Sequence, residues 1–406
     1  MWIMAYQERI TVEQAISILI EYAAIKGTMA LPLLEAAGYI CAEDLKTTIP
    51  QPPFDRSAMD GYAVRRTDLE NASKDMPILL PISDCLYAGS ASDTALAPGH
   101  AVRIMTGAPI PEGADCVIPQ EIVDCDKNAV IFYKPQTGKL NICIQGEDIT
   151  KGTFLIRQGT RLQAAHIGLL AGQGISRIMV FEKPEIAVMS TGDELVPIGS
   201  PLSSGKIYDS NQPMLCARLM ELGAQPYPIL PVADRTDLLC DRISEALVHC
   251  DMIITTGGVS VGQRDLLPEA VKQLGGHILF HGIAAKPGSP AMAAVYKEKM
   301  ILCLSGNPFA AAATFELLGR PVIYFMGGLI SPFPTQCNAI LCSSFLKDSK
   351  IRRFVRAYLS NGKVTIPDVC HSSGSLSSFA GCNCLVDIPA GHPPLHPGEI
   401  VRVILL

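Results

Sequence analysis

The sequence predicts a multidomain protein, α/β plus β, built around a central doubly wound, parallel-type α/β domain. Three observations predict it. The chain has 406 residues, which exceeds the usual size of one domain. Apolar runs alternate with helical stretches over residues 185–328. Short β-rich runs broken by Pro and Gly lie on either side of that segment.

Composition excludes several classes of protein. The 33 basic and 39 acidic residues give a net charge of -6, and no basic block or zinc-finger pattern is present, so nucleic acid is not expected as a partner. Fourteen cysteines without a secretory signal indicate reduced thiols and a cytoplasmic protein. The longest apolar region, 309–330, contains Glu316, Arg320 and Pro321 and predicts a buried helix followed by a loop or strand, not a membrane span.

The first element predicted is a helix over residues 11–26. Its apolar residues recur at helical spacing, and Thr11 with Gln14 forms a capping-box pattern. Gly27 is expected to end the helix.

A mostly β domain is predicted next, from residue 47 to about residue 144. Short apolar runs are separated there by Pro and Gly, as in "HAVRIMTGAPIPEGADCVIPQ".

The α/β domain follows, with five apolar runs and four helical stretches in alternation. This order is typical of strands that lie parallel and are covered by helices. The runs are "EIAVMS", "PYPILPV", "DMIITT", "HILFHGI" and "MILCLS", and the helices are expected near 214–222, 236–248, 266–274 and 308–318.

The last part of the chain predicts a small β domain. Two strand patterns in "RRFVRAYLSNGKVTIPDV" are joined through Asn361-Gly362, a strong hairpin signal. The chain closes on a further strand pattern, "EIVRVILL".

Ligands of open α/β sheets bind where the carboxyl ends of the strands meet the following loops. The loops that follow the apolar runs carry polar groups. Gly-rich turns can cradle phosphate with backbone N–H groups, although any α/β fold also needs tight turns. The loops are Thr191-Gly192-Asp193-Glu194, Asp234, Gly257-Gly258-Val259-Ser260, Lys286-Pro287-Gly288-Ser289 and Ser305-Gly306-Asn307-Pro308.

Acidic residues in these loops indicate a metal ion. Glu194, Asp234 and Asp265 would repel a phosphate unless a cation such as Mg²⁺ bridged them or one carboxylate took a proton. Alternatively, Asp193 or Asp234 caps a helix, and Lys286 is an ordinary solvated lysine. The Walker A, G-x-G-x-x-G, H-E-x-x-H and G-x-S-x-G patterns are missing. The residues alone therefore predict Mg²⁺-assisted chemistry on a phosphate-bearing ligand.

Eight motifs in one order resemble the molybdopterin molybdenumtransferase family, the family of MoeA and the gephyrin E domain. The resemblance covers nearly the whole chain. The motifs are "SAMDGYAV" (57–64), "RIMTGAPIPEGAD" (103–115), "GEDI" (146–149), "STGDEL" (190–195), "IYDSN" (207–211), "TTGGVSVGQRD" (255–265), "KPGSP" (286–290) and "SGNP" (305–308).

The resemblance implies an enzyme of the last step of molybdenum cofactor synthesis. Such an enzyme inserts molybdate into the dithiolene of adenylylated molybdopterin and cleaves the pyrophosphate bond with Mg²⁺ to release AMP. The resemblance also implies a homodimer with a cleft between the α/β domain of one subunit and the β domain of the other. Its implied partners are an upstream molybdopterin adenylyltransferase and downstream molybdoenzymes. The expected domains are a discontinuous linker domain (1–50 and 145–180), an inserted mostly β domain (51–144), the α/β domain (181–330) and a C-terminal β-barrel (331–406).

Site residues are carried over by motif. The resemblance places Asp60, Thr106, Asp148, Glu194, Asp234, Asp265 and Lys286 in the active site. Asp234 and Asp265 would bind Mg²⁺, and Lys286 would bind molybdate. The glycine loop would hold the phosphates, and Arg356 and Ser375 would be further oxyanion ligands. The full predicted substrate-binding set is Thr191, Gly192, Asp193, Gly257, Gly258, Ser260, Ser289, Pro290, Ser305, Gly306, Asn307, Pro308, Arg356 and Ser375.

The chain departs from the common family pattern around the oxyanion. Ser289 replaces a lysine of K-P-G-K-P, and Ser305 and Ala310 replace the first Pro and last Ser of P-G-N-P-V-S. Two alternatives therefore stay open beside the transferase. One is a molybdopterin-binding paralogue that handles tungstate, and the other is a non-catalytic scaffold or carrier on the same fold.

Overall fold

The computed structural model describes residues 7–90, 95–259, 266–368 and 371–406. The chain divides into two compact units. The first contains residues 1–43, 158–167 and 176–406, and the second contains residues 44–157 and 168–175.

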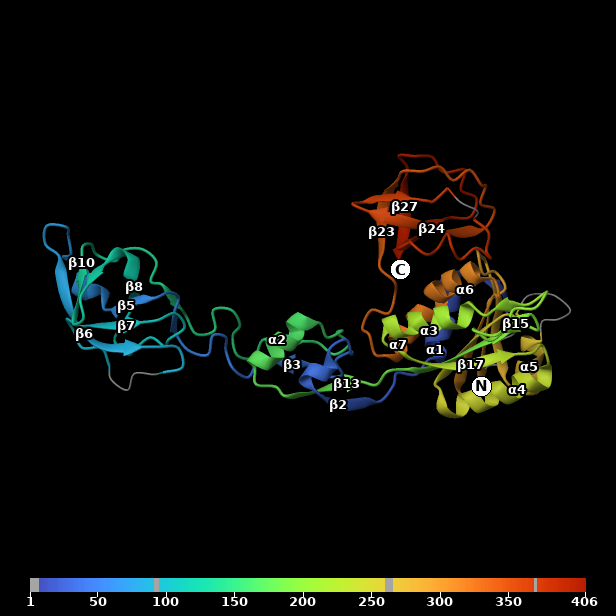
Figure 1. Ribbon diagram of the computed structural model, residues 1–406, viewed down its shortest axis with the longest axis horizontal. Coiled ribbons are helices and arrows are strands. Elements are labelled where there is room, and N and C mark those ends of the chain that lie inside the picture. Colours follow the sequence, from blue (N-terminus) through green and yellow to red (C-terminus); the bar gives the residue numbers. More distant parts are fainter. Residues whose placement is uncertain (1–6, 91–94, 260–265, 369–370) are drawn as a thin grey trace. The chain divides into compact units, whose positions relative to one another are not determined.

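A seven-stranded sheet forms the centre of the first unit (Figure 1). Strands β17, β14, β18 and β22 run parallel, as predicted, whereas β21 runs antiparallel to both of its neighbours. The predicted doubly wound α/β domain is confirmed, but its sheet is mixed. In spatial order the strands are β1 (Gln7–Ile10), β19 (His277–Ile283), β21 (Met292–Tyr296), β22 (Lys299–Leu304), β18 (Met252–Thr256), β14 (Glu185–Thr191) and β17 (Gln225–Val232).

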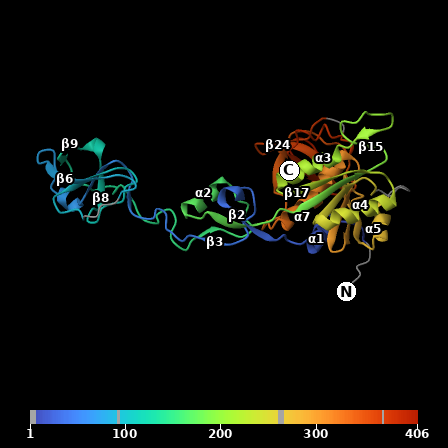
Figure 2. The same ribbon diagram turned by 60° about the horizontal axis from the view of Figure 1, so that its bottom comes forward.

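Helices cover both faces of this sheet because successive side chains of its buried strands point to opposite faces. Ile186 and Val188 of β14 pack in one core with α1, α3, α6 and α7, and Ala187 and Met189 pack in the other with α4 and α5. In two views α4 and α5 lie side by side (Figures 1 and 2). The helices are α1 (Val12–Tyr22), α3 (Asn211–Leu222), α4 (Thr236–His249), α5 (Leu267–Gln273), α6 (Pro308–Thr314) and α7 (Arg320–Met326).

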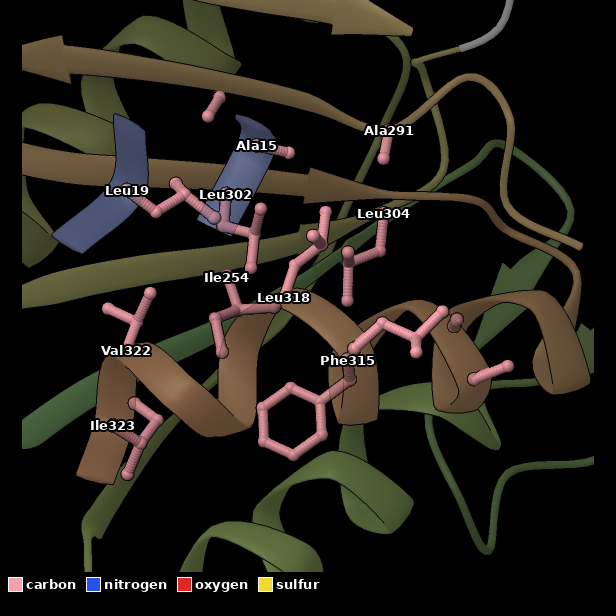
Figure 3. Close-up of a cluster of buried hydrophobic side chains, with 14 of the residues drawn as sticks. Ala15, Leu19, Ile254, Ala291, Leu302, Leu304, Phe315, Leu318, Val322 and Ile323 are labelled. Carbon is pink, nitrogen blue, oxygen red and sulfur yellow. The ribbon is translucent and has the colours of Figure 1, made fainter. Parts of the chain in front are cut away.

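The capping box at Thr11 and Gln14 is present, but α1 ends at Tyr22 and not at Lys26. Ala23 is extended, with φ -84° and ψ 140°. Lys26 instead contacts distant residues, because its N–H donates to the Met326 carbonyl and its Nζ lies 2.9 Å from Asp251 Oδ1. These tertiary contacts override the local helix propensity. Helix α1 also packs on the central sheet, as Figure 3 shows for Ala15 and Leu19.

The segment Pro308–Met326 is a continuous buried helix with a π-helical turn at Phe315–Gly319. It is apolar and long enough for a membrane span, yet 89% of it is buried inside the fold. Figure 3 shows Leu318 and Val322 facing the strand residues Ile254 and Leu302. The predicted buried helix is therefore confirmed.

A closed β-barrel forms the C-terminal part of the first unit. Strand β24 pairs with both β25 and β26, which closes the ring. The predicted hairpin turn is present, with positive φ at Asn361 (50°) and Gly362 (74°). Strand β20 (Ala285–Lys286) leaves the α/β domain and pairs with β24 of the barrel. The barrel strands are β23 (Gln336–Leu341), β24 (Arg352–Ser360), β25 (Lys363–Thr365), β26 (Cys384–Ile388) and β27 (Ile400–Leu405).

The second unit is mostly β, with a six-stranded sheet. Gly61 permits the close approach of two of its strands, because a Cβ atom there would lie 2.1 Å from the Ile118 carbonyl oxygen. The strands are, in spatial order, β8 (Cys116–Pro119), β5 (Gly61–Val64), β7 (Ala101–Ile104), β6 (Ile78–Leu86), β10 (Ala129–Phe132) and β9 (Asp124–Cys125).

Short strand pairs join the segments before and after this sheet in the sequence. The predicted division of the chain into four domains stays a prediction. The pairs are β2 (Thr28–Pro32) with β13 (Arg177–Phe181), β3 (Leu45–Lys46) with β12 (Phe154–Ile156), and β4 (Arg56–Ser57) with β11 (Ile142–Cys143). Helix α2 (Ala164–Gly172), the short strands β15 (Leu195–Val196) and β16 (Ile207–Tyr208), and 3-10 turns at Leu33–Ala36, Arg66–Leu69 and Gln120–Ile122 complete the elements.

The buried carboxylate of Glu316 generates a stability prediction. It accepts hydrogen bonds from Arg218 Nε (2.6 Å) and Arg320 Nη1 (3.0 Å), and Arg320 Nη1 also donates to the Leu405 carbonyl. We expect Glu316→Gln to lower the free energy of unfolding by about 3 kcal/mol, because the buried Arg320 loses its counter-charge and Arg218 keeps only the exposed Glu221. Urea unfolding of the full chain followed by circular dichroism measures the loss.

Glu221→Gln is the matched control, because Glu221 binds the same Arg218 at 2.8 Å but its side chain is 64% exposed. We expect a change of about 0.5 kcal/mol or less there. Equal losses in the two variants would show that burial of the Glu316 carboxylate is not the cause.

Candidate active site

A cavity of about 950 Å³ lies at the carboxyl edge of the central sheet, between the strand-end loops and the barrel. All five loops predicted from the apolar runs contribute to its wall. The predicted residues that line it are Thr191, Gly192, Glu194, Asp234, Gly257, Gly258, Lys286, Ser289, Pro290, Ser305, Gly306, Asn307, Pro308 and Arg356. Asp193 and Ser375 contact residues of the wall, whereas Ser260 and Asp265 lie outside the described residues.

Glycines let the loops after β14, β18 and β22 approach one another closely. Gly257 has φ +91°, and a Cβ atom on it would lie 2.3 Å from the Thr191 carbonyl oxygen. A Cβ atom on Gly306 would lie 3.4 Å from Gly257 Cα. Backbone groups therefore form this floor of the cavity, where side chains would otherwise fill the space.

Asp234 is held by a hydrogen-bond network and does not cap a helix. Its Oδ1 accepts from Thr191 Oγ1 at 2.7 Å, and its N–H donates to Asp193 Oδ1 at 3.1 Å. Helix α4 begins after Arg235 without a side-chain cap. The helix-cap alternative for the side chains of Asp193 and Asp234 is therefore wrong, and the network aims Asp234 at the cavity.

Glu194 adds a second carboxylate to the wall of the cavity. A Cβ atom on Gly192 would lie 2.7 Å from each of its carboxylate oxygens, so the glycine makes room for the acid. Among the described residues, no group of three or more His, Cys, Asp or Glu side chains is arranged to hold a metal ion. The two carboxylates suit a hard cation such as Mg²⁺, which commonly binds one or two protein carboxylates together with substrate phosphates.

The barrel packs on the start of α6. The N–H groups of Phe309 and Ala310 donate to the Ser373 carbonyl at 3.0 and 3.2 Å. Arg356 is buried, stacks on the Phe309 ring at 3.7 Å, and donates to the carbonyls of Ser372 (2.7 Å) and Ser375 (2.5 Å). These contacts make Arg356 the residue that shapes the 372–375 loop beside the cavity.

Sequence reasoning assigned no role to the start of α3. Asp209 and Asn211 line the cavity and are buried, and the Asp209 carboxylate accepts from the N–H groups of Asn211 (3.0 Å) and Gln212 (3.2 Å). Asn211 Nδ2 donates to the Gly306 carbonyl at 2.8 Å and so ties α3 to the loop after β22. The signal was the "DSN" triplet before a helix, because Asp in that position satisfies N-terminal N–H groups.

Three further wall residues, Phe345, Arg353 and His371, come from the barrel and were also missed. The rings of Phe345 and His371 meet edge to face with centroids 5.6 Å apart. Burial, together with the nearby positive charge of Arg356, lowers the pKa of His371. No local pattern marks these residues, since only closure of the barrel brings them to the cavity.

The predicted residues Asp60, Thr106 and Asp148 belong to the second unit. Asp60 Oδ1 accepts from the Thr106 N–H (2.8 Å) and from Thr106 Oγ1 (2.7 Å). These two donors, the backbone N–H first, lower the pKa of the Asp60 carboxyl. Asp148 is exposed, and its N–H donates to the Gln51 carbonyl at 3.0 Å.

Known proteins are similar to this chain over nearly its whole length. Family models match in three parts: the MoeA N-terminal region (domain I and II) at residues 10–174, a probable molybdopterin binding domain at 187–324, and the MoeA C-terminal region (domain IV) at 338–406. A molybdopterin molybdenumtransferase of Staphylococcus aureus (strain MSSA476) is 35% identical over 399 residues, which are 98% of this chain and 95% of the relative.

Two more proteins extend the likeness. A molybdopterin molybdenumtransferase of Bacillus subtilis (strain 168) is 38% identical over 373 residues, which are 90% of this chain and 86% of the relative. The crystal structure of a molybdopterin biosynthesis MoeA protein from Pyrococcus horikoshii superposes with a TM-score of 0.85 at 33% identity, over 98% of this chain and 99% of that one.

The close approach at Gly257 yields a prediction. We expect Gly257→Ala to displace the loop, because a left-handed Ala costs about 1–2 kcal/mol and its Cβ would collide with the Thr191 carbonyl. Ligand binding in the cavity should weaken at least tenfold, as measured by calorimetric titration with AMP. Gly275→Ala is the control, because its φ is +77° but no atom lies within 4 Å of the place that the new methyl group would take. Equal weakening in the two variants would contradict the steric account.

The contact between Thr106 and Asp60 yields a prediction about pH. We expect Thr106→Val to raise the pKa of Asp60 toward its ordinary value, because the carboxylate loses the hydroxyl donor and keeps only the N–H. The carboxyl ¹³C chemical shift of Asp60 followed through an acid titration measures the change. A pKa that stays at the wild-type position would show that the hydroxyl bond does not stabilise the ionised carboxylate.

Proposed function

Because the chain belongs to the molybdopterin molybdenumtransferase family, we propose that its cavity inserts molybdate into adenylylated molybdopterin with the aid of Mg²⁺. The observation that carries the proposal is that two kinds of residue line two sides of the same cavity. Carboxylates and glycine turns line the side of the sheet, whereas Lys286, Arg353 and Arg356 line the side of the barrel. A substrate with phosphates at one end and an incoming oxyanion at the other suits this division.

The reaction needs no change of oxidation state. The two sulfur atoms of the dithiolene replace oxygen atoms on molybdate, which leave as water or hydroxide. A water oxygen adds to phosphorus as the phosphoanhydride bond breaks, and AMP leaves with the bonding electron pair. Two oxygen atoms leave molybdate as water, formed with the two dithiol protons and two protons from solvent, and one water is consumed at phosphorus, so one molecule of water is released overall.

The residues at the sheet edge would bind and orient the phosphates. The turn at Gly257 and Gly258 presents backbone groups to the cavity, as phosphate-binding turns do. Asp234 and Glu194 would repel those phosphates unless a cation lay between them. We propose that Asp234 holds Mg²⁺ with Asp265, which lies outside the described residues. When bound, Mg²⁺ supplies positive charge to the oxygens of the breaking bond.

Lys286 would bind the oxyanion on the other side. Its side chain is exposed, lies at the end of β20 and lines the cavity. Ser289, at the position of a family lysine, donates from Oγ to the Ala285 carbonyl at 2.5 Å and so supports the strand that carries Lys286. A paralogue that prefers tungstate stays the alternative, and the oxyanion specificity of the purified protein separates the two.

We further propose a cytoplasmic homodimer in which the second unit of one subunit supplies Asp60, Thr106 and Asp148 to the cavity of the other. The proposal of a homodimer rests on the family resemblance. The fourteen cysteines of the chain suit a reducing compartment, in which thiols stay reduced. An upstream adenylyltransferase and downstream molybdoenzymes would be the partners in the pathway, while neither nucleic acid nor a membrane is proposed.

The decisive experiment is AMP release from adenylylated molybdopterin with Mg²⁺, with and without molybdate. We expect release that depends on molybdate, and a loss on the order of 100-fold in Asp234→Asn, because charge-stabilising groups at a reacting centre contribute about this much. Asp237→Asn is the control, since Asp237 is 58% exposed and pairs with Arg235 outside the cavity. Binding without AMP release by the wild type would favour a scaffold or carrier.

Mixing inactive subunits extends the same test to the dimer. Hybrids of Asp60→Asn and Asp234→Asn subunits would place both substitutions in one site and leave the other intact. Activity should therefore return on mixing, to about a quarter of the wild-type value if subunits exchange at random. No recovery from mixed and exchanged subunits would contradict a site shared between them.

A further inference from the structure

Lys286 and Arg353 stand side by side at the wall of the cavity. Lys286 is in β20 and Arg353 in β24, and the two are register partners in a parallel strand pair. Partners in neighbouring strands are about 4.8 Å apart and point to the same face. Both residues line the cavity, so the pairing directs two positive side chains to one place.

Neither positive charge is neutralised within the part of the chain that the structure describes, where no ion pair involves Lys286 or Arg353. The preceding residue, Arg352, is an arginine of the same sheet whose charge is paired with carboxylates. Arg352 forms two 2.8 Å bonds to Asp387 and one 2.5 Å bond to Glu13, and it lines a different cavity. Like charges on adjacent strands are unfavourable unless an anion lies between them.

The Arg353 guanidinium is also held in place. Its Nε donates to Ser349 Oγ at 3.4 Å, and its Cζ lies 5.9 Å from the centre of the Phe345 ring. Phe345 is buried and packs against His371, so the ring near Arg353 is itself packed within the barrel. A guanidinium fixed on an aromatic support loses less entropy when it binds, and its planar fork suits two oxygens of a tetrahedral anion.

We propose that Lys286 and Arg353 together form a two-cation subsite for a dianionic tetrahedral oxyanion, in which Arg353 is a binding residue of its own. This inference rests on the proposed function, which supplies the molybdate dianion and, on the pterin substrate, a pyrophosphate group whose two phosphates carry one negative charge each. Arg356 differs from Arg353, since Arg356 is buried and donates to the Ser372 and Ser375 carbonyls. The subsite lies where β20 crosses from the α/β domain to the barrel.

The test compares Arg353→Gln, Arg353→Lys and the control Lys363→Gln, an exposed lysine on β25 of the same barrel that does not line the cavity. The KM for molybdate and the KM for adenylylated molybdopterin are measured separately by AMP release. We expect Arg353→Gln to raise one of them about 10- to 100-fold, the loss typical of a charge-assisted hydrogen bond. Arg353→Lys should recover part of the effect and Lys363→Gln should have none.

The two KM values identify the anion. A rise confined to molybdate assigns the subsite to the incoming oxyanion, and a rise confined to the pterin substrate assigns it to a substrate phosphate. Unchanged values for both substrates in Arg353→Gln, or a rise of equal size in Lys363→Gln, would overturn the proposal. Thermal unfolding checks that the variants are folded, and if Arg353→Gln is not, Arg353→Lys must still alter one KM.

A direct measurement of anion binding tests this inference independently of the proposed function. If the wild type releases no AMP, calorimetric titration with molybdate and with inorganic phosphate still compares wild type and Arg353→Gln. Weaker anion binding by Arg353→Gln would support the subsite although the transferase proposal fails. Equal binding by the two proteins would overturn the subsite alone.

Discussion

The close approach of three strand-end loops is the constraint on which the rest of the site depends. Gly257 and Gly306 lie so near to each other and to Thr191 that a side chain at Gly257 would strike the Thr191 carbonyl. With the loops in this position, Thr191 reaches Asp234, and Asn211 at the start of α3 reaches Gly306. The parallel strands β14, β18 and β22 hold the loops together because all three end at the same edge of the sheet.

The barrel completes the cavity through contacts of a different kind. Its Ser373 carbonyl takes the place of a cap on α6, while Arg356 stacks on Phe309 of that helix. Strand β20 continues from the α/β domain into the barrel sheet, so Lys286 belongs to both walls. The sheet edge thus brings acidic and backbone groups, and the barrel brings cations. Two chemically distinct ends in one cavity fit the proposed reaction, in which a phosphoanhydride bond is cleaved at one end and an oxyanion is bound at the other.

Much of the α/β domain could be predicted from local patterns, whereas its exceptions depend on distant residues. The five apolar runs became strands, and the Asn361-Gly362 turn formed the expected hairpin. Strand β21 was missed because its short apolar run lies beside a Gly- and Pro-rich loop, and its reversed direction depends on pairing with both β19 and β22. Helix α1 ends early because Lys26 bonds to Met326 and Asp251.

The residues of the candidate site likewise fall into those that local sequence patterns predict and those that depend on distant parts of the chain. Loop residues such as Asp234 and Lys286 could be found because each follows a strand pattern directly, and the structure brings both to one cavity. Arg353 and His371 could not, since their place in the wall arises only when the barrel closes.

The measurement that tests the proposed oxyanion site most directly is an anomalous difference map at the molybdenum edge from crystals of the protein with AMP, Mg²⁺ and molybdate. We predict a molybdenum peak in the cavity beside Lys286, and a peak elsewhere with this cavity empty would contradict the proposal.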